Sequence, residues 1–518
     1  MAAELRERNK NTNIMNLNMN DKLKSKHTIS SHSQVLRGGC ESRRSSQITP
    51  KAQTAPSDGA LADWETILKE AESTSTGARL KMEAEQREKG EGKPHTDATL
   101  RLFGHKEEQV RVTLFRDRAA WCPYCQKVWI MLEEKKIPYR VKHINMRSYG
   151  PKPDWFLNMV PGGLLPAIEL DGKVYTDSVA IMQLLDQTYS DYGTRMIPPG
   201  KEARIERLYK LERKLFGAWC EFLFAPSSMY PIGMWLPDGR KKALEELFAK
   251  VDEELGRMWK KNKSPWFQGG DGPSLIDLQF ISHIERMEAS LIYWKGMRIR
   301  DREWENLERW LCAFDERESY QATKSDFYTH VMNIPPQYGE AFPDTENDNV
   351  RDAVAFIGGG SWNLPKSYAS GLRSAPRSRK HMEGTSWSIP TPNTDLNSWE
   401  PIRPPFAVTD EEARHEAAYE MASNHDNIVQ FACRAMGAKG SKQYSAILTD
   451  PHASSNLAYK DDVDMLLRMT TQGLLRGMLP QFDAGSISDE RRYGLSKCLR
   501  YVRDRVGVPR DMGFPAAQ

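Results

Sequence analysis

The stretch VTLFRD at residues 112–117, followed by WCPYC at residues 121–125, decides how this chain folds. The first stretch is partly β-branched and alternates, so it predicts a strand. Residues 126–136 follow with apolar side chains at helical spacing. A Cys-x-x-Cys at the point where a strand gives way to a helix is typical of a thiol-redox site.

The position of Cys122 favours a reactive thiolate. It is expected at a helix N-terminus, where unpaired N–H groups and the helix dipole stabilise negative charge on sulfur. Cys125 follows one turn later and is placed to resolve a mixed disulfide formed at Cys122. We therefore predict that Cys122 is the nucleophile and Cys125 the resolving thiol.

Two other interpretations of the cysteine pair are weaker. A zinc half-site usually needs a second pair of Cys or His ligands, but the other cysteines occur singly along the chain. They are Cys40, Cys220, Cys312, Cys433 and Cys498. Two buried structural thiols would not explain a Cys-Pro-Tyr-Cys placed between strand and helix.

Composition sets outer limits on function. The chain has 518 residues, a net charge of +3 and interspersed charges of both signs, which indicates no nucleic-acid or membrane partner. Seven cysteines, mostly unclustered, are typical of a reducing compartment. No apolar run is long enough to cross a bilayer, and the length predicts two to four domains.

The N-terminal segment, residues 1–98, is expected to be disordered, with one weak helix. Residues 22–55 are rich in Ser, Thr, Lys and Arg and nearly free of acids, which is a transit-peptide composition. A chloroplast location is the first expectation; a plain disordered tail on a cytoplasmic protein is the alternative. Residues 63–87 have helical composition but a weak apolar stripe, and they predict a loosely docked helix.

Residues 110–193 predict a thioredoxin-like α/β domain with the order βαβ, hairpin, helix. The expected strands are 111–116, 139–144, 165–170 and 173–176, and the last two are joined by an Asp-Gly hairpin turn at 171–172. Asp177 and Ser178 open the next helix, whose apolar stripe follows at helical spacing.

Residues 200–335 predict an all-helical domain. Its strong helical segments are 205–224, 241–260, 274–294 and 303–318. Ser274 and Asp277 have the spacing of a capping box just before an apolar run, and we expect them to fix where a buried helix begins.

The remaining sequence predicts an irregular linker at 340–408 and a helical extension at 409–518. Gly358–Gly360 is not followed by the Gly-Lys-Ser/Thr of a phosphate loop. His415 and His425 lack the carboxylate partners of a di-iron bundle, so we interpret both as ordinary helix or surface residues.

These motifs, in this order and at this spacing, make residues 110–335 resemble the glutathione transferase family. The resemblance is to its cysteine-type members, and an omega-like pattern runs through residues 152–166. It consists of Lys152-Pro153-Asp154-Trp155-Phe156, Asn158, Pro161, Gly163 and Leu164-Leu165-Pro166. The extended tail resembles long plant, algal and cyanobacterial members, with the iota class as the best match. The resemblance implies glutathione as co-substrate and no metal.

The resemblance assigns roles around the glutathione sulfur. Cys122 would be the catalytic cysteine facing that sulfur. Leu165 would offer backbone hydrogen bonds to the cysteinyl part of glutathione, and Pro166 after it would be cis.

It also assigns the two ends of glutathione. Ser178 and its helix N-terminus would hold the γ-glutamyl carboxylate, and Asp177 the ammonium. Lys152 would meet the glycyl carboxylate. The simpler alternatives are a helix cap for Asp177 and Ser178 and a solvated surface lysine for Lys152.

Cys125 departs from the omega pattern, because many cysteine-class transferases keep only the first cysteine. We therefore expect disulfide, mixed-disulfide or dehydroascorbate reduction and glutathionyl transfer, with small molecules or proteins as acceptors. The alternatives are a transferase that conjugates electrophiles, a non-enzymatic glutathione-binding scaffold, and an iron–sulfur cluster shared between two subunits. A homodimer is implied by the family alone, and the extension is a candidate for binding a protein partner.

Overall fold

The computed structural model describes residues 61–117, 120–146, 152–224, 239–300, 304–324, 410–440, 454–478 and 488–506, with scattered positions in 330–342. The predicted transit peptide, Gly358–Gly360 and nearly all of the predicted linker lie outside these residues. Within the described residues no helix is both long enough and apolar enough to span a membrane.

A five-stranded mixed sheet forms around the strand at residues 112–116. Its order is β1-β3-β2-β4-β5, with only β2 and β3 parallel. The strands are β1 (Leu100–Arg101), β2 (Val112–Arg116), β3 (Tyr139–His143), β4 (Ala167–Leu170) and β5 (Lys173–Thr176). The parallel pair is joined through α4 (Pro123–Lys135), so the Cys-x-x-Cys lies at the start of the crossover helix.

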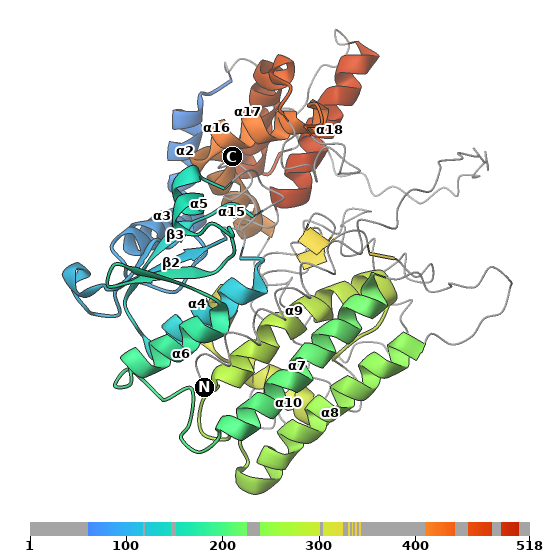
Figure 1. Ribbon diagram of the computed structural model, residues 1–518. Helices are drawn as coiled ribbons and strands as arrows, with labels where there is room; N and C mark the ends of the chain where they lie inside the picture. The colour runs from blue at the N-terminus through green and yellow to red at the C-terminus, as the bar shows by residue number, and fades with distance from the viewer. Residues whose placement is uncertain are drawn as a thin grey trace, which may run out of the picture. The chain divides into compact units, whose positions relative to one another are not determined.

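The two faces of the sheet are covered by different helices. Alternate residues of β2 point to opposite sides, so Val112 and Leu114 pack under α4 and α6 (Ser178–Thr188). Phe115 packs on the other face against α5 (Asp154–Met159), where Phe156 is fully buried. Figure 1 shows α4 and α6 together on one side of the strands. This is the predicted thioredoxin-like arrangement.

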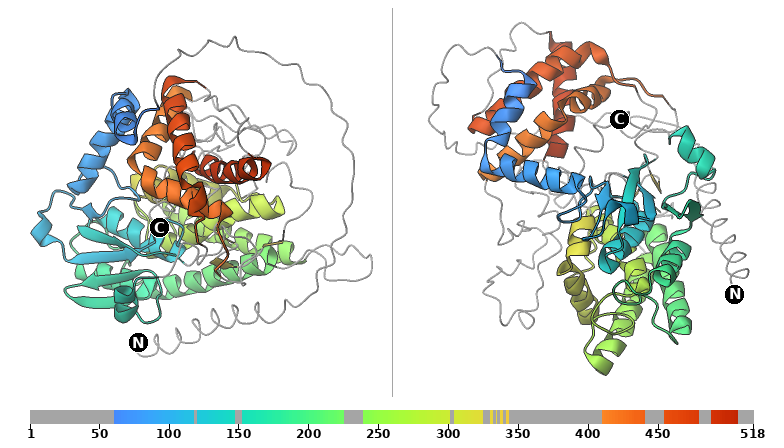
Figure 2. Two further views of the ribbon diagram at one scale, coloured as in Figure 1. Left: turned by 90° about the horizontal axis from the view of Figure 1, so that it is seen from above. Right: turned by 90° about the vertical axis from the view of Figure 1, so that its left-hand side faces the viewer.

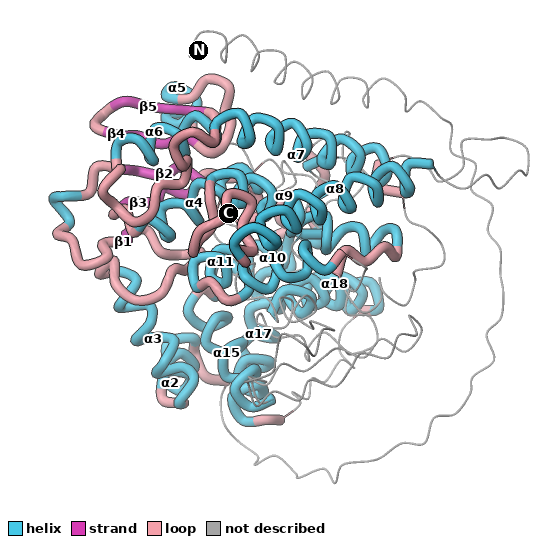
Figure 3. The backbone as a smooth tube through the Cα atoms, turned by 90° about the horizontal axis from the view of Figure 1, so that it is seen from below, coloured by secondary structure: helices cyan, strands magenta, loops and turns pink. Residues whose placement is uncertain are grey.

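A group of helices follows and packs against α4 (Figures 1 and 3). It comprises α7 (Glu202–Leu223), α8 (Gly239–Asn262), α9 (Leu275–Lys295), α10 (Glu305–Asp315) and α11 (Glu318–Thr323). Helix α9 is buried on nearly every face and contacts both α4 and α7. The predicted capping box is present, because the Asp277 carboxylate accepts from the Ser274 N–H at 2.8 Å.

The last helices form a bundle with the first two. They are α15 (Asp410–Ser423), α16 (His425–Ala432), α17 (Lys460–Arg476) and α18 (Asp489–Val506), with short 3-10 turns η7 (Cys433–Met436) and η9 (Leu457–Tyr459). A further 3-10 turn, η1 (Glu107–Gln109), precedes the sheet. Helices α2 (Trp64–Glu72) and α3 (Ser75–Glu88) pack on α15, and α2 also contacts α17. Figure 2 shows α2 beside the C-terminal helices.

This bundle corrects the prediction of one loosely docked helix at 63–87. The segment forms two helices, and Ile67 and Ala71 of α2 are fully buried. The Trp64 ring stacks on His425 at 4.8 Å, and its Nε1–H donates to Asp464 at 2.7 Å. The packing partners of α2 are α15 and α17, which lie far away in the sequence, so the sequence of α2 alone does not show them.

Candidate functional site

Cys122 lies where the sequence analysis expects it. It is the N-cap residue of α4, with extended backbone geometry (φ −64°, ψ 114°), and Pro123 begins the helix. Its side chain is 5% exposed, and its sulfur is 4.0 Å from the carbonyl oxygen of Leu165. Cys122 therefore lies at the N-terminal end of α4, where the N–H groups of the first turn lack helical partners.

Cys125 lies deeper than Cys122. It is 1% exposed, and both thiols are free. Burial, then the neighbouring Cys122 sulfur, raise the pKa of the Cys125 thiol well above its ordinary value. Cys125 therefore keeps its proton at neutral pH, which leaves Cys122 as the sulfur suited to attack first.

The peptide bond between Leu165 and Pro166 is cis, as the resemblance implied. It lies just before β4, and its Leu165 carbonyl faces the Cys122 sulfur. The segment thus borders Cys122, although the two residues are 43 positions apart in the sequence.

Lys152 lies on the approach to α5. Its Nζ donates to the carbonyl of Asn145 at 2.9 Å, and its stem packs beside Gly163. Burial lowers the pKa of Lys152, while negative charge on Cys122 acts in the opposite direction. Lys152 is therefore a partly buried cation within electrostatic range of Cys122 rather than a solvated surface lysine.

Asp177 and Ser178 open α6. The Asp177 carboxylate accepts from the N–H groups of Val179 and Ala180, both at 3.0 Å, so the helix-cap interpretation is correct for Asp177. Asp177 has a positive φ of 72° and remains exposed, whereas Ser178 is buried. Capping does not exclude ligand binding, because an exposed carboxylate has further lone pairs.

Asp117 is a functional-site residue that the sequence pattern does not single out. It follows β2 and is completely buried. Its Oδ2 accepts from the N–H groups of Trp121 at 2.6 Å and Cys122 at 3.2 Å. The ligand atoms of Asp117, Cys122 and Cys125 all lie within 4.8 Å of one another. The carboxylate therefore holds the backbone of the loop that ends at Cys122.

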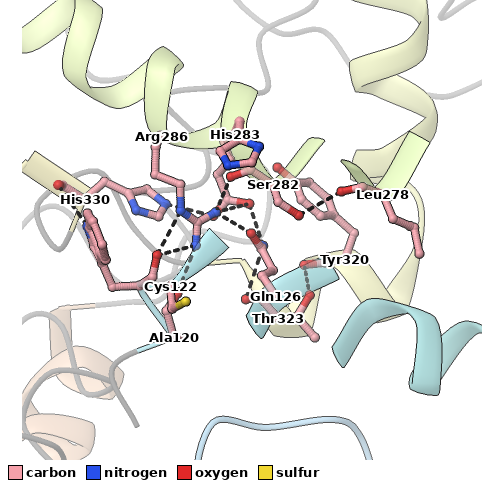
Figure 4. A network of polar contacts seen from close by, with 12 residues as sticks. Ala120, Cys122, Gln126, Leu278, Ser282, His283, Arg286, Tyr320, Thr323 and His330 are labelled. Carbon is pink, nitrogen blue, oxygen red and sulfur yellow. Dashed lines mark hydrogen bonds and ion pairs between the residues drawn. The ribbon is translucent and has the colours of Figure 1, made fainter. Parts of the chain in front are cut away.

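Arg286 of α9 fixes the same loop from the helical part of the chain (Figure 4). Its guanidinium donates to the Trp121 carbonyl through Nε at 2.9 Å and Nη2 at 2.7 Å, and to the Ala120 carbonyl at 3.3 Å. It also bonds to Gln126 and to the Ser282 carbonyl. At 2% exposed, Arg286 is a buried brace between α9 and the residues before Cys122.

Glu285, the residue next to Arg286, completes this network. Its carboxylate accepts from Gln126 at 2.7 Å and lies 2.8 Å from the ring nitrogen Nε2 of His330. The His330 carbonyl in turn accepts from the Trp121 indole at 3.3 Å. Both side chains of α9 thus hold the start of α4.

A second polar cluster lies between α4, α7 and α9. Burial lowers the pKa of Lys127 to about 7 and that of His283 to about 4. Burial alone would raise the pKa of Glu212, but Arg213 and His283 together lower it well below its ordinary value. The Tyr124 ring packs edge-on against His283 at 5.2 Å and carries Lys127 over its face at 4.7 Å.

Sequence reasoning missed these two networks because their partners are far apart along the chain. One signal was present. Residues 275–295 carry Gln279, His283, Glu285 and Arg286 within an otherwise apolar helix, and charges inside a buried helix need partners. Trp219 and Phe222 of α7 are buried core residues, and the Trp219 indole donates to Ser290.

This chain is similar to known proteins in the part that contains Cys122 and Pro166. Residues 121–188 match the family model described as the glutathione S-transferase N-terminal domain. The chain is 29% identical over 204 residues to "Glutathione S-transferase DHAR2" of Arabidopsis thaliana, which covers 39% of this chain and 84% of that protein.

Two further relatives agree. "Probable glutathione S-transferase DHAR1, cytosolic" of Oryza sativa subsp. japonica is 30% identical over 205 residues, covering 39% of this chain and 84% of that protein. "Glutathione S-transferase omega-1" of Rattus norvegicus is 28% identical over 184 residues, covering 35% of this chain and 69% of that protein. With Cys122 heading the crossover helix of a thioredoxin-like sheet, this chain belongs to the glutathione S-transferase family and to its cysteine type.

Proposed function

We propose that this protein is a glutathione-dependent thiol transferase and reductase in which Cys122 is the nucleophile. The observation that carries the proposal is the position of Cys122. Cys122 is the N-cap residue of α4, and its sulfur is 4.0 Å from the Leu165 carbonyl oxygen and within 4.8 Å of a second, buried thiol. The relationship to DHAR and omega transferases supports the same chemistry.

The first step is attack of the Cys122 thiolate on a glutathionylated or oxidised substrate. Attack on the glutathione sulfur of a mixed disulfide forms a Cys122–glutathione disulfide, and the acceptor leaves as a thiolate. A second glutathione then attacks the glutathione sulfur of this disulfide, which forms oxidised glutathione and frees the Cys122 thiolate. Alternatively, Cys125 attacks the Cys122 sulfur, which forms the Cys122–Cys125 disulfide and releases glutathione. Dehydroascorbate is a further acceptor, reduced at the expense of two glutathione molecules.

Glutathione is proposed to lie along the residues named by the resemblance. Leu165 and Pro166 border the Cys122 sulfur and would pair with the cysteinyl backbone. Ser178 at the start of α6 suits the γ-glutamyl carboxylate and Asp177 the ammonium. Lys152, a partly buried cation near Cys122, suits the glycyl carboxylate.

The test is the pH dependence of iodoacetamide alkylation, measured by mass spectrometry at each cysteine with and without glutathione. Cys122 is expected to react at a pH well below the free-thiol pKa of about 8.5, and glutathione is expected to protect it. Cys312, on α10 and outside the site, serves as the internal reference. Equal reactivity of Cys122 and Cys312, with no protection, would remove the proposal and favour a scaffold.

Turnover assays separate reduction from conjugation. Purified wild type, C122S and C125S are compared on a hydroxyethyl disulfide, on dehydroascorbate and on a chlorodinitrobenzene electrophile. C122S is expected to lose all three activities. C125S should lose reduction that runs through the second thiol and keep conjugation. A C125S protein with unchanged disulfide turnover and strong conjugation would favour the conjugating transferase instead.

The composition of residues 22–55 supports a chloroplast location as a further proposal. A fluorescent protein fused to residues 1–60 tests it, and diffuse fluorescence in the cytoplasm would contradict it. The homodimer and a protein partner for residues 409–518 remain predictions, which the measured mass in solution and affinity capture with this segment would address.

A further inference from the structure

Asp117 is a buried carboxylate whose two oxygens differ: one accepts hydrogen bonds, and the other has no hydrogen-bond partner among the described residues. Oδ2 accepts two backbone N–H groups, from Trp121 and Cys122. Oδ1 is buried and has no hydrogen-bond partner in the part of the chain that the structure describes. An unpaired buried carboxylate oxygen costs free energy, so it is a candidate for a function that the resting protein does not display.

The surroundings of Asp117 indicate what that function is. A carboxylate oxygen of Asp117 and the sulfurs of Cys122 and Cys125 lie within 4.8 Å of one another. Cys125 is almost inaccessible to water, so solvent is poorly placed to take its proton. Yet Cys125 must lose that proton before it can attack a disulfide, since the thiolate is the reactive form.

We propose that Asp117 is the proton acceptor for Cys125 in the step that resolves the Cys122–glutathione mixed disulfide. The proposal rests on the function proposed above and adds to it a residue that acts on the second thiol.

The Asp117 carboxylate takes the proton from the Cys125 thiol, and the electron pair left on sulfur attacks the Cys122 sulfur. The Cys122–Cys125 bond forms while the bond from Cys122 to glutathione breaks, and glutathione leaves as a thiolate that takes a proton from water. The mixed disulfide is reduced, and the cysteine pair is oxidised.

Two positively charged side chains lie near the Asp117 carboxylate. Arg116, also fully buried, donates to the Asp117 backbone carbonyl at 2.7 Å and lies over the Trp129 ring at 3.9 Å. The ammonium of Lys152 is within electrostatic range of Asp117 and both thiols. Two positive charges thus lie near the carboxylate that the proposal uses.

The experiment follows the second step separately from the first. Full-length protein is mixed with oxidised glutathione, quenched with acid at intervals, and the peptide containing both cysteines is analysed by mass spectrometry. Glutathionylation of Cys122 marks the first step, and its replacement by the internal disulfide marks the second. D117N is the central variant, because an amide oxygen can still accept the Trp121 and Cys122 N–H groups whereas the amide is not a base.

The expected result is that D117N accumulates the mixed disulfide and resolves it about 100-fold more slowly than wild type at neutral pH, the usual scale of general-base catalysis. The deficit should shrink as pH rises, because hydroxide then deprotonates Cys125. Resolution as fast as in wild type, or a deficit that is constant with pH, would overturn the proposal and leave Asp117 as a loop anchor.

Two further measurements keep the proposal open to refutation. If D117N does not fold, wild type is tested at constant pH with increasing imidazole buffer. An internal base predicts no dependence on buffer, and a rate proportional to imidazole would overturn the proposal. C125S should stop at the mixed disulfide. If no mixed disulfide forms at Cys122 even in C125S, the proposed function fails, and this inference fails with it.

Discussion

Replacing Arg286 by Met tests whether α9 holds the catalytic loop in place. The substitution keeps much of the side-chain volume but removes a buried guanidinium that donates to Trp121, Ala120 and Ser282 carbonyls. Breaking one partner of a buried charged network costs about 3–5 kcal/mol. Since domains are typically stable by about 5–15 kcal/mol, R286M should fold but with much of its stability lost.

R286M should also slow disulfide reduction by the folded protein, because the loop before Cys122 loses its support. Two of the lost hydrogen bonds end on the residue directly before Cys122, so its sulfur would no longer be fixed against Leu165. A displacement of about 1 Å at a reacting atom can cost about 100-fold in rate. R286M is therefore expected to reduce a hydroxyethyl disulfide about 100-fold more slowly than wild type under conditions where it is fully folded.

The assay combines urea unfolding, followed by tryptophan fluorescence, with steady-state disulfide reduction well below the unfolding midpoint. R300M is the matched control. Arg300 is a buried arginine bonded to Glu308 at 2.6 Å and to Asp315 at 2.7 Å, and both partners belong to α10 rather than to the cysteine loop. R300M should lose comparable stability and keep its activity. The reasoning is refuted if R286M unfolds within about 1 kcal/mol of wild type and reduces disulfides at the wild-type rate.

Three other substitutions give sharp expectations. Burial lowers the pKa of Lys127 to about 7, and the unfolded chain keeps that proton up to about 10.5. Between pH 7 and 9 the unfolded state therefore binds more protons than the folded state, so the free energy of unfolding should rise with pH. In urea titrations K127M should lose this rise. An equal rise in K127M would contradict the assignment to Lys127. W64A should speed hydrogen exchange in α17, because Trp64 donates to Asp464; unchanged exchange would argue against the bundle. D277A should lose about 3 kcal/mol of unfolding free energy in urea, because the buried Asp277 carboxylate accepts from Ser274, Phe267 and the Trp310 indole. The rate of Cys122 alkylation should stay as in wild type. A loss of less than about 0.5 kcal/mol would contradict this prediction.

Much of the fold was predictable because its signals are local. The strand, the Cys-x-x-Cys and the helix after it are contiguous, so periodicity and helix-start chemistry identify them without tertiary contacts. The hairpin at Asp171–Gly172 and the capping box of Ser274 and Asp277 were found for the same reason, and both are present. The helix cap at Asp177 likewise depends only on the next three residues.

The sequence by itself therefore determined which thiol heads a helix and where the main elements begin. Only the tertiary structure decided what surrounds that thiol. Arg286 reaches the Trp121 carbonyl across 165 positions, and the Leu165 carbonyl reaches Cys122 across 43. The unpaired oxygen of Asp117 and the partner of Trp64 were equally invisible. Local hydrogen bonds and periodicity depend only on neighbouring residues, whereas the pairing of buried polar groups depends on which distant segments share a core.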